Sequence, residues 1–319
     1  MTGLTQGIAA AGSGLFDRSV PPKGYAWWYI DAISDDGEFA LTLIVFVGSV
    51  FSPYYAWSGR NDPLNHCAVN VALYGRRHRR WAMTERGRRR VRLGPDEIAI
   101  GPSHVHWDGT SLTANLRETG MPLPHAVRGR VRLTPRVMND RFFAIDRAGA
   151  HQWRPVAPMA DVEVNFDAPA LSWRGTGYFD MNFGDAPLED AFRYWDWSRL
   201  HQKNGITSLS YTADLRSGEQ TSHALRFHPD GRLETATHPP PTDLGATRIF
   251  GIRRRTHALD TSPMTLGATL EDTPFYSRST LSTRIDGQWA SGVHESLDAD
   301  RLRKTLVKLM LPFRMPRRA

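Results

Sequence analysis

The segment GTGYFDMNFG, residues 175–184, carries the residues best suited to chemistry. On a strand, side chains two positions apart share a face, so Tyr178, Asp180 and Asn182 are predicted on one face and apolar residues on the other. If Asp180 faces an apolar cavity, loss of solvation favours its protonated form and makes it a potential general acid. The alternative is a structural carboxylate that accepts hydrogen bonds from turn amides.

His151 and Trp153, in the segment AHQWRP, share a strand face by the same spacing. A histidine positions a carboxyl group or a water, and an indole face stabilises a developing carbocation. Alone, such a pair is more often part of ordinary core packing. HExxH, GxSxG, P-loop and GxGxxG motifs are missing from the sequence, and His104 and His106 lack a third ligand. The sequence therefore predicts neither a cofactor nor a metal.

The elements that must position these residues are short strands. Alternating or β-branched runs recur between Gly, Asn, Asp and Pro, a pattern typical of all-β proteins. The apolar run at 39–51 is too short to cross a bilayer as a helix and predicts a buried strand or strand pair. An Asp-Gly pair in RFHPDGRLE, residues 226–234, predicts a hairpin.

A chain of 319 residues fits two domains better than one. Closed barrels remove unpaired strand edges, and barrels of lipocalin size hold one apolar ligand, which the ten tryptophans would suit. The predicted fold is all-β, with two antiparallel β-barrel domains and a short C-terminal amphipathic helix. The domains are expected at 1–187 and 188–300, followed by a basic amphipathic tail at 301–319.

The formal charge is +7, and the arginines cluster at 75–80, 86–92 and 252–255. Nucleic acid is not predicted as a partner, because no zinc finger, helix-turn-helix or RNP-type strand accompanies the arginines. In the tail, leucines recur at helical spacing opposite lysines and arginines, which indicates an interfacial helix that docks on a membrane surface. We expect the β-domains to fold without this tail. An amphipathic helix packed on its own protein is the alternative.

The single cysteine, Cys67, excludes an intramolecular disulfide framework and suits a reducing compartment. The N-terminal segment lacks the basic and apolar regions of a secretory signal. We therefore expect a cytoplasmic protein that associates peripherally with the inner or an intracytoplasmic membrane.

Several long segments resemble the bacterial carotenoid 1,2-hydratase family. The resemblance is carried by GYAWWYIDAISDDGEFALTLIVFVGSVFSPYYAW (24–57), NHCAVNVALYG (65–75), WAMTERG (81–87), HQWRPVAP (151–158), GTGYFDMNFGDAPLEDAF (175–192) and WDWSRLH (195–201). It implies a pair of lipocalin-like domains that hydrate the C1=C2 double bond of acyclic carotenoids, such as neurosporene and lycopene, without a cofactor. The substrates are then the carotenoid and water.

By motif, the catalytic positions of that family fall on His151, Trp153, Tyr178 and Asp180. We assign Asp180 as proton donor, with Asp31 as the alternative acid, Tyr178 as its partner, Trp153 as a π-face for the cation and His151 as the group that positions the acid or the water. Substrate-binding walls are predicted from Trp27, Trp28, Tyr54, Tyr55, Trp57 and Asn182. Two rivals stay open: a lipocalin-like carrier of apolar isoprenoid lipids, and a related cofactor-free cyclase or isomerase.

Overall fold

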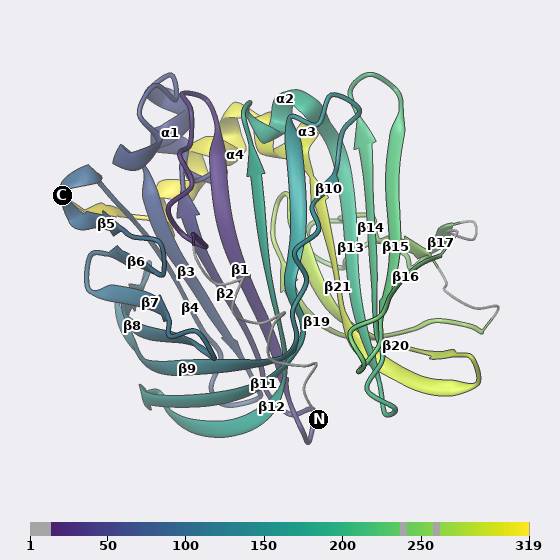
Figure 1. Cartoon of the computed structure of the whole chain (residues 1–319). Helices are drawn as coiled ribbons and strands as arrows, with labels where there is room; N and C mark the ends of the chain where they lie inside the picture. Colours follow the sequence, from purple (N-terminus) through teal and green to yellow (C-terminus); the bar gives the residue numbers. More distant parts are fainter. Residues whose placement is uncertain (1–13, 237–240, 258–261, 319) are drawn as a thin grey trace. The chain divides into compact units, whose positions relative to one another are not determined.

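The computed structural model describes residues 14–236, 241–257 and 262–318 (Figure 1). The first thirteen residues, which belong to the N-terminal segment interpreted above, lie outside the described residues. The chain forms two compact units. The first comprises residues 1–142, 151–187 and 308–319, and the second comprises residues 143–150 and 188–307.

The first unit is built on one large sheet. Its strands are β1 (Tyr25–Ser34), β2 (Ala40–Val47), β3 (Cys67–Tyr74), β4 (Arg80–Arg86), β5 (Val91–Leu93), β6 (Glu97–Ile100), β7 (Ser103–Trp107), β8 (Leu112–Gly120), β9 (His125–Val137), β11 (His151–Ala168), β12 (Ala170–Gly184) and β22 (Arg317–Arg318). Their order is β22-β4-β3-β2-β1-β12-β11-β9-β8-β7-β6-β5. The neighbouring strands are antiparallel, apart from β22, which runs parallel to β4. The apolar run at 39–51 supplies β2, as a single strand.

The sheet of the first unit has one face in an apolar core. Trp28, Ile30 and Phe179 belong to this core, together with valines and leucines from the neighbouring strands. β1 is buried along nearly its whole length, on both faces, so its sequence shows no alternation of polar and apolar residues.

Two long strands bend the sheet. β11 spans 18 residues and β12 spans 15, and the register of β11 against β12 shifts at Pro155/Ala157 and again at Ala157/Ala160. Such bulges bend a strand and increase its twist. Figure 1 shows β9, β11 and β12 curving away from the direction of β1–β4, so that the sheet curls.

The second unit has a smaller antiparallel sheet. Its strands are β13 (Phe192–Gln202), β14 (Thr207–Leu215), β15 (Gln220–Phe227), β16 (Leu233–Ala236), β19 (Thr265–Asp272), β20 (Tyr276–Ile285) and β21 (Gln288–Asp298). The unit also contains the short strands β10 (Phe143–Ala144), β17 (Pro241–Asp243) and β18 (Arg255–His257). The main order is β16-β15-β14-β13-β21-β20-β19, and β17 pairs with β18. The hairpin predicted at 226–234 is confirmed, because β15 and β16 pair across it.

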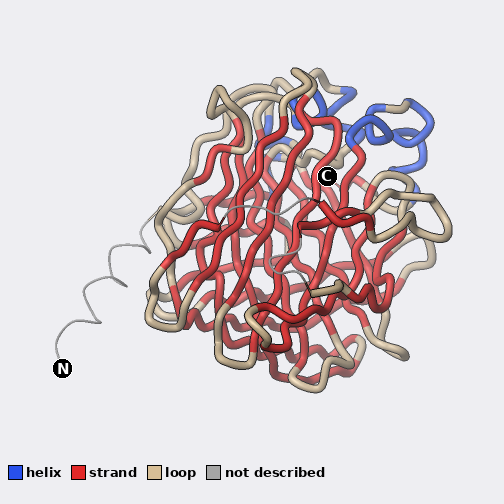
Figure 2. Tube along the Cα trace, turned by 90° about the vertical axis from the view of Figure 1, so that its right-hand side faces the viewer, coloured by secondary structure: helices blue, strands red, loops and turns tan. Residues whose placement is uncertain are grey.

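Helices are few and short in the described residues, as Figure 2 shows by colour. They are α1 (Pro53–Trp57), α2 (Leu188–Ala191), α3 (Ala299–Arg303), α4 (Thr305–Met310) and the 3-10 turns Pro63–Asn65, Arg88–Arg90 and Leu311–Phe313. None of them is long and apolar enough to cross a membrane. The all-β prediction is confirmed.

The predicted C-terminal helix is divided into α3 and α4, because Lys304 has extended backbone angles. After Phe313 the chain joins the first sheet as β22. Met315 is buried, and the Arg314 guanidinium lies 4.4 Å over the Trp81 ring. The last residues are thus part of the fold of the first unit. Deleting the tail would therefore remove β22 from the first sheet.

Candidate active site

The candidate acid lies on β12, on the face of the first sheet that is turned away from the apolar core. Phe179 and Met181 belong to that core, so Asp180 between them faces the opposite side. Trp153 on β11 reaches the same face, because it is the strand partner of Asn182. The strand spacing and the pairing of β11 with β12 thus bring four predicted site residues together on this face: Trp153, Tyr178, Asp180 and Asn182.

Asp180 accepts three hydrogen bonds. Its Oδ2 accepts from the Tyr178 hydroxyl at 2.8 Å and from Trp153 Nε1 at 3.0 Å. Its Oδ1 accepts from Asn182 Nδ2 at 3.0 Å. Trp153 Nε1 also lies 3.2 Å from the Tyr178 oxygen, so indole, phenol and carboxyl form one connected group.

Burial and hydrogen bonding act on Asp180 in opposite directions. Its exposed fraction is 4%, and Tyr178 and Trp153 are both 0% exposed. Burial disfavours the charged carboxylate, whereas three donated hydrogen bonds favour it.

The side-chain amide of Asn182 has an oxygen as well as the NH₂ group that donates to Asp180. Its Oδ1 is buried and has no hydrogen-bond partner among the described residues. Rotation of the amide by half a turn would present this oxygen to Asp180 in place of the NH₂ group. Asn182 can therefore donate to the carboxylate and accept from the carboxylic acid.

His151 belongs to a neighbouring pair on the same face. Its Nδ1 lies 2.8 Å from the Tyr25 hydroxyl, and the two rings stack at 5.7 Å. Gly184, the strand partner of both residues, makes this possible, since a Cβ there would lie 2.3 Å from His151 Nδ1. His151 pairs with Gly184, which follows Asp180 by four residues on β12.

β1 supplies an aromatic wall beside this group. Tyr25, Trp27 and Tyr29 pair in register with β12 and share the face of Asp180. Trp27 stacks on Tyr25 at 4.9 Å, and Tyr29 packs edge-on against Tyr178 at 6.2 Å. Sequence reasoning missed Tyr25 and Tyr29, although the two-residue spacing from Trp27 in YAWWYID could have found both.

The other predicted walls lie elsewhere. Trp28 is on the opposite face, where its Nε1 donates to the Leu15 carbonyl in the apolar core. Tyr55 on α1 donates to the Gly24 carbonyl at 2.8 Å. Tyr54 packs against Trp57, which is 53% exposed. The structure thus does not gather these four residues around Asp180.

Many arginines of the sequence clusters are paired within the protein. Arg86 makes a buried two-pronged ion pair with Glu118, at 3.1 and 2.8 Å. Arg255 bonds to Asp196 at 2.8 Å and Arg88 pairs with Asp62. These ion pairs within the protein explain part of the arginine clusters, and no anionic partner is needed for them.

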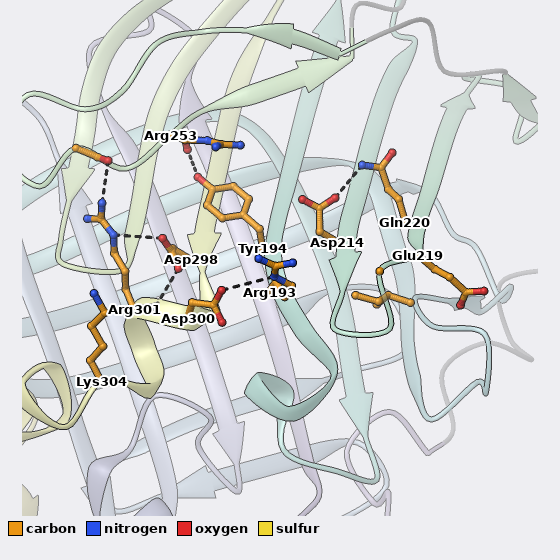
Figure 3. A pocket seen from close by; sticks show the side chains of 13 residues that line it. Arg193, Tyr194, Asp214, Glu219, Gln220, Arg253, Asp298, Asp300, Arg301 and Lys304 are labelled. Carbon is orange, nitrogen blue, oxygen red and sulfur yellow. Dashed lines mark hydrogen bonds and ion pairs between the residues drawn. The ribbon is translucent and has the colours of Figure 1, made fainter.

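The second unit holds a polar cavity of about 610 Å³. Its lining is rich in charged side chains, and Figure 3 shows ion pairs across it: Arg193 with Asp300, and Arg301 with Asp298. A wall of paired charges is unsuited to a hydrocarbon chain. No group of three His, Cys, Asp or Glu residues that could hold a metal is found in either unit, within the part of the chain that the structure describes.

A buried hydrogen-bonded group crosses the second sheet. Ser296 joins Asp196 at 2.6 Å to His294 at 3.0 Å. Burial raises the pKa of Asp196 to about 7, although hydrogen bonds from Ser296 and Arg255 lower it. Burial lowers the pKa of His294 to about 3. His294 is therefore neutral at pH 7, and its 3.7 Å approach to Asp196 is not an ion pair.

Comparison with known proteins decides the family. A family model described as carotenoid hydratase CrtC matches residues 43–319. An acyclic carotenoid 1,2-hydratase of Thiocapsa roseopersicina is 52% identical over 305 residues, which cover 95% of this chain and 75% of the relative. The chain belongs to the carotenoid hydratase CrtC family. A second such hydratase, from Rubrivivax gelatinosus, is 46% identical over 97% of this chain and 77% of its own.

The fold of this CrtC family member has a distant solved relative. A crystal structure described as AttH from Nitrosomonas europaea aligns with a TM-score of 0.60 over 86% of this chain and 92% of that one. The sequence identity is 14%, so this likeness concerns the fold alone. It confirms the predicted lipocalin-like fold class.

Proposed function

We propose that this chain adds water to the terminal C1=C2 double bond of acyclic carotenoids, such as neurosporene, lycopene and their derivatives, and forms 1-hydroxy carotenoids. The family assignment supports the reaction class. The observation that carries the proposal is Asp180, a buried carboxyl group that accepts hydrogen bonds from Trp153, Tyr178 and Asn182.

The chemistry explains why such a carboxyl group is needed. A trisubstituted alkene has no carbonyl to polarise, so hydration starts with transfer of a proton to C2, which leaves a tertiary cation at C1. Asp180 donates this proton. The three donors then stabilise the carboxylate that forms, and this stabilisation grows as the proton leaves, so it lowers the barrier.

The aromatic residues stabilise the cation. Trp153 and Tyr178, which both bond to Asp180, supply the π-faces, and each cation–π contact contributes on the order of 0.5–2 kcal/mol. His151, held by the Tyr25 hydroxyl at 2.8 Å, helps to position the acid. Water then bonds to C1 and gives the tertiary alcohol.

We propose that the reaction needs no cofactor. Desalting and prolonged treatment with a chelator should leave hydration intact, and loss of activity restored by one metal ion would overturn this part. In heavy-oxygen water, the new hydroxyl group should carry the label. Label arriving from dioxygen instead would identify a hydroxylase and refute the proposed function.

We propose further that the C-terminal segment docks on the membrane that holds the substrate. Its exposed apolar side chains are Leu306 (71%), Leu309 (54%), Met310 (46%) and Phe313 (72%). Lysines and arginines are interleaved with them, as is typical of interfacial segments. Because β22 and Met315 anchor the end of this segment, the apolar side chains are presented from a folded element.

Point variants test the docking better than a deletion, since a deletion would remove β22 from the sheet. The double variant Leu309→Ser/Phe313→Ser should weaken binding to vesicles of anionic phospholipid. The matched control is Leu123→Ser, an 81% exposed leucine in the loop before β9. Equal flotation of the double variant and the unaltered protein with vesicles would rule out docking through this segment.

A further inference from the structure

Hydration requires two proton transfers, and Asp180 accounts for one of them. When the oxygen of water bonds to the C1 cation, that oxygen carries an extra proton, which must leave. Asp180 must also recover the proton that it gave to C2. If the proposed function holds, a second group must accept the proton of the attacking water.

Asp31 is a second carboxyl group on the same face of the sheet. It lies on β1, directly opposite Tyr178 on β12, while Tyr29 is opposite Asp180. Asp31 is 0% exposed, and its neighbours Ile30 and Ala32 face the apolar core on the other side. Carboxyl groups are rarely buried so completely, because loss of solvation costs several kcal/mol.

The register sets the spacing of the two carboxyl groups. Directly opposed residues have Cβ atoms about 4.5–5.5 Å apart, and diagonal neighbours lie about 7–8 Å apart, with their Cβ atoms somewhat closer. Asp31 and Asp180 are diagonal neighbours. In glycosidases that activate a water between two carboxyl groups, the groups are about 6.5–9.5 Å apart. The spacing here therefore leaves room for a reacting carbon and a water.

A hydroxyl group suited to hold that water lies beside Asp31. Thr42 on β2 is the strand partner of Asp31, and its exposed fraction is 3%. Its Oγ1 is buried without a hydrogen-bond partner among the residues that the structure describes. A buried hydroxyl group normally has a partner, and a bound water is the usual one where the protein supplies none.

We propose that Asp31 is the base of the hydration and that Thr42 positions the water. Asp180 transfers its proton to C2, and the π electrons of the double bond form the new C2–H bond. The water oxygen bonds to C1, and one of its protons passes to the Asp31 carboxylate. The proton returns from Asp31 to Asp180 by way of the Tyr178 hydroxyl, which accepts one proton as it gives its own to Asp180. The sum is alkene plus water giving alcohol, with the protein unchanged.

Deuterium exchange separates the two roles. In deuterated water, Asp180 adds a deuteron at C2, and a cation that is not captured loses a proton and returns to alkene. In Asp31→Asn, hydration should fall by about 10²–10⁴-fold, while deuterium still enters the recovered carotenoid. In Asp180→Asn, both hydration and exchange should stop. Thr42→Val should lower hydration less than Asp31→Asn and also raise the ratio of exchange to hydration.

The matched control is Asp161→Asn, because Asp161 is an exposed partner of Arg136 on β9 and should leave both rates unchanged. Circular dichroism and melting temperature establish folding. If Asp31→Asn does not fold, Asp31→Glu should still raise the ratio of exchange to hydration. An unchanged ratio in folded Asp31 variants, or loss of exchange together with hydration, would overturn the proposal. Failure of the unaltered protein to hydrate any acyclic carotenoid would instead refute the proposed function.

Discussion

Replacing Tyr178 by phenylalanine removes one hydroxyl group from the candidate site and keeps the ring. The ring still packs edge-on against Tyr29 at 6.2 Å, and the fully buried volume is nearly conserved. The lost interaction is the 2.8 Å hydrogen bond that the hydroxyl donates to Asp180. Trp153 and Asn182 still donate to the carboxyl group, so Asp180 keeps two of its three donors.

The expected fall in the rate of hydration follows from the change in charge on Asp180 during the reaction. A hydrogen bond to a neutral acceptor contributes about 0.5–1.5 kcal/mol, and one to a charged acceptor about 1.5–3 kcal/mol. The hydroxyl thus stabilises the carboxylate in the transition state by roughly 1–1.5 kcal/mol more than it stabilises the acid. This corresponds to a fall in the single-turnover rate constant of about 5–13-fold, because 1.36 kcal/mol is a factor of ten.

The assay is single-turnover hydration of lycopene in detergent micelles, with products separated by chromatography. Tyr194→Phe is a matched control, since Tyr194 lies in the second unit and its hydroxyl donates to the Arg253 carbonyl. An unchanged single-turnover rate constant in folded Tyr178→Phe would refute the role of the hydroxyl. A fall of more than a thousandfold would indicate that Tyr178 itself supplies the proton.

The remaining predictions concern stability. Glu118→Gln leaves Arg86 buried without its carboxylate and should destabilise the first unit by about 3–5 kcal/mol, measured by urea unfolding; a loss under 1 kcal/mol would show that the pair is dispensable. Asp196 binds its proton more tightly in the folded state, so its contribution to stability is lost as the pH rises from about 4 to about 7. His294 binds its proton less tightly in the folded state, so its contribution is lost as the pH falls from about 6.5 to about 3. The difference in unfolding free energy between the unaltered protein and Asp196→Asn should therefore fall with rising pH, and the difference for His294→Asn should rise; slopes of the same sign would contradict the assignment.

The sequence predicts those parts of the site that lie on one strand. The two-residue spacing alone places Tyr178, Asp180 and Asn182 together, and the structure joins all three by hydrogen bonds. The contact of Trp153 with Asp180 depends on the register of β11 against β12, which bulges alter and which no local pattern encodes.

Other features of the site and of the tail depend on pairing between strands that are far apart in the sequence. β1 is apolar on both faces, so its pattern does not say that Trp27 shares the face of Asp180 while Trp28 enters the core. The parallel pairing of Arg317 with Glu85 joins residues far apart in the chain, in a segment whose helical spacing favours an interfacial helix. Such segments are governed by tertiary contacts rather than by local propensity.

The turnover of Asp180→Asn with lycopene tests the central claim most directly. The amide keeps the shape of the side chain and removes the acidic proton, so hydration should fall by at least about 10²–10⁴-fold while melting temperature and circular dichroism stay unchanged. Near-normal turnover in this folded variant would contradict the account and would make Asp180 a structural hydrogen-bond acceptor.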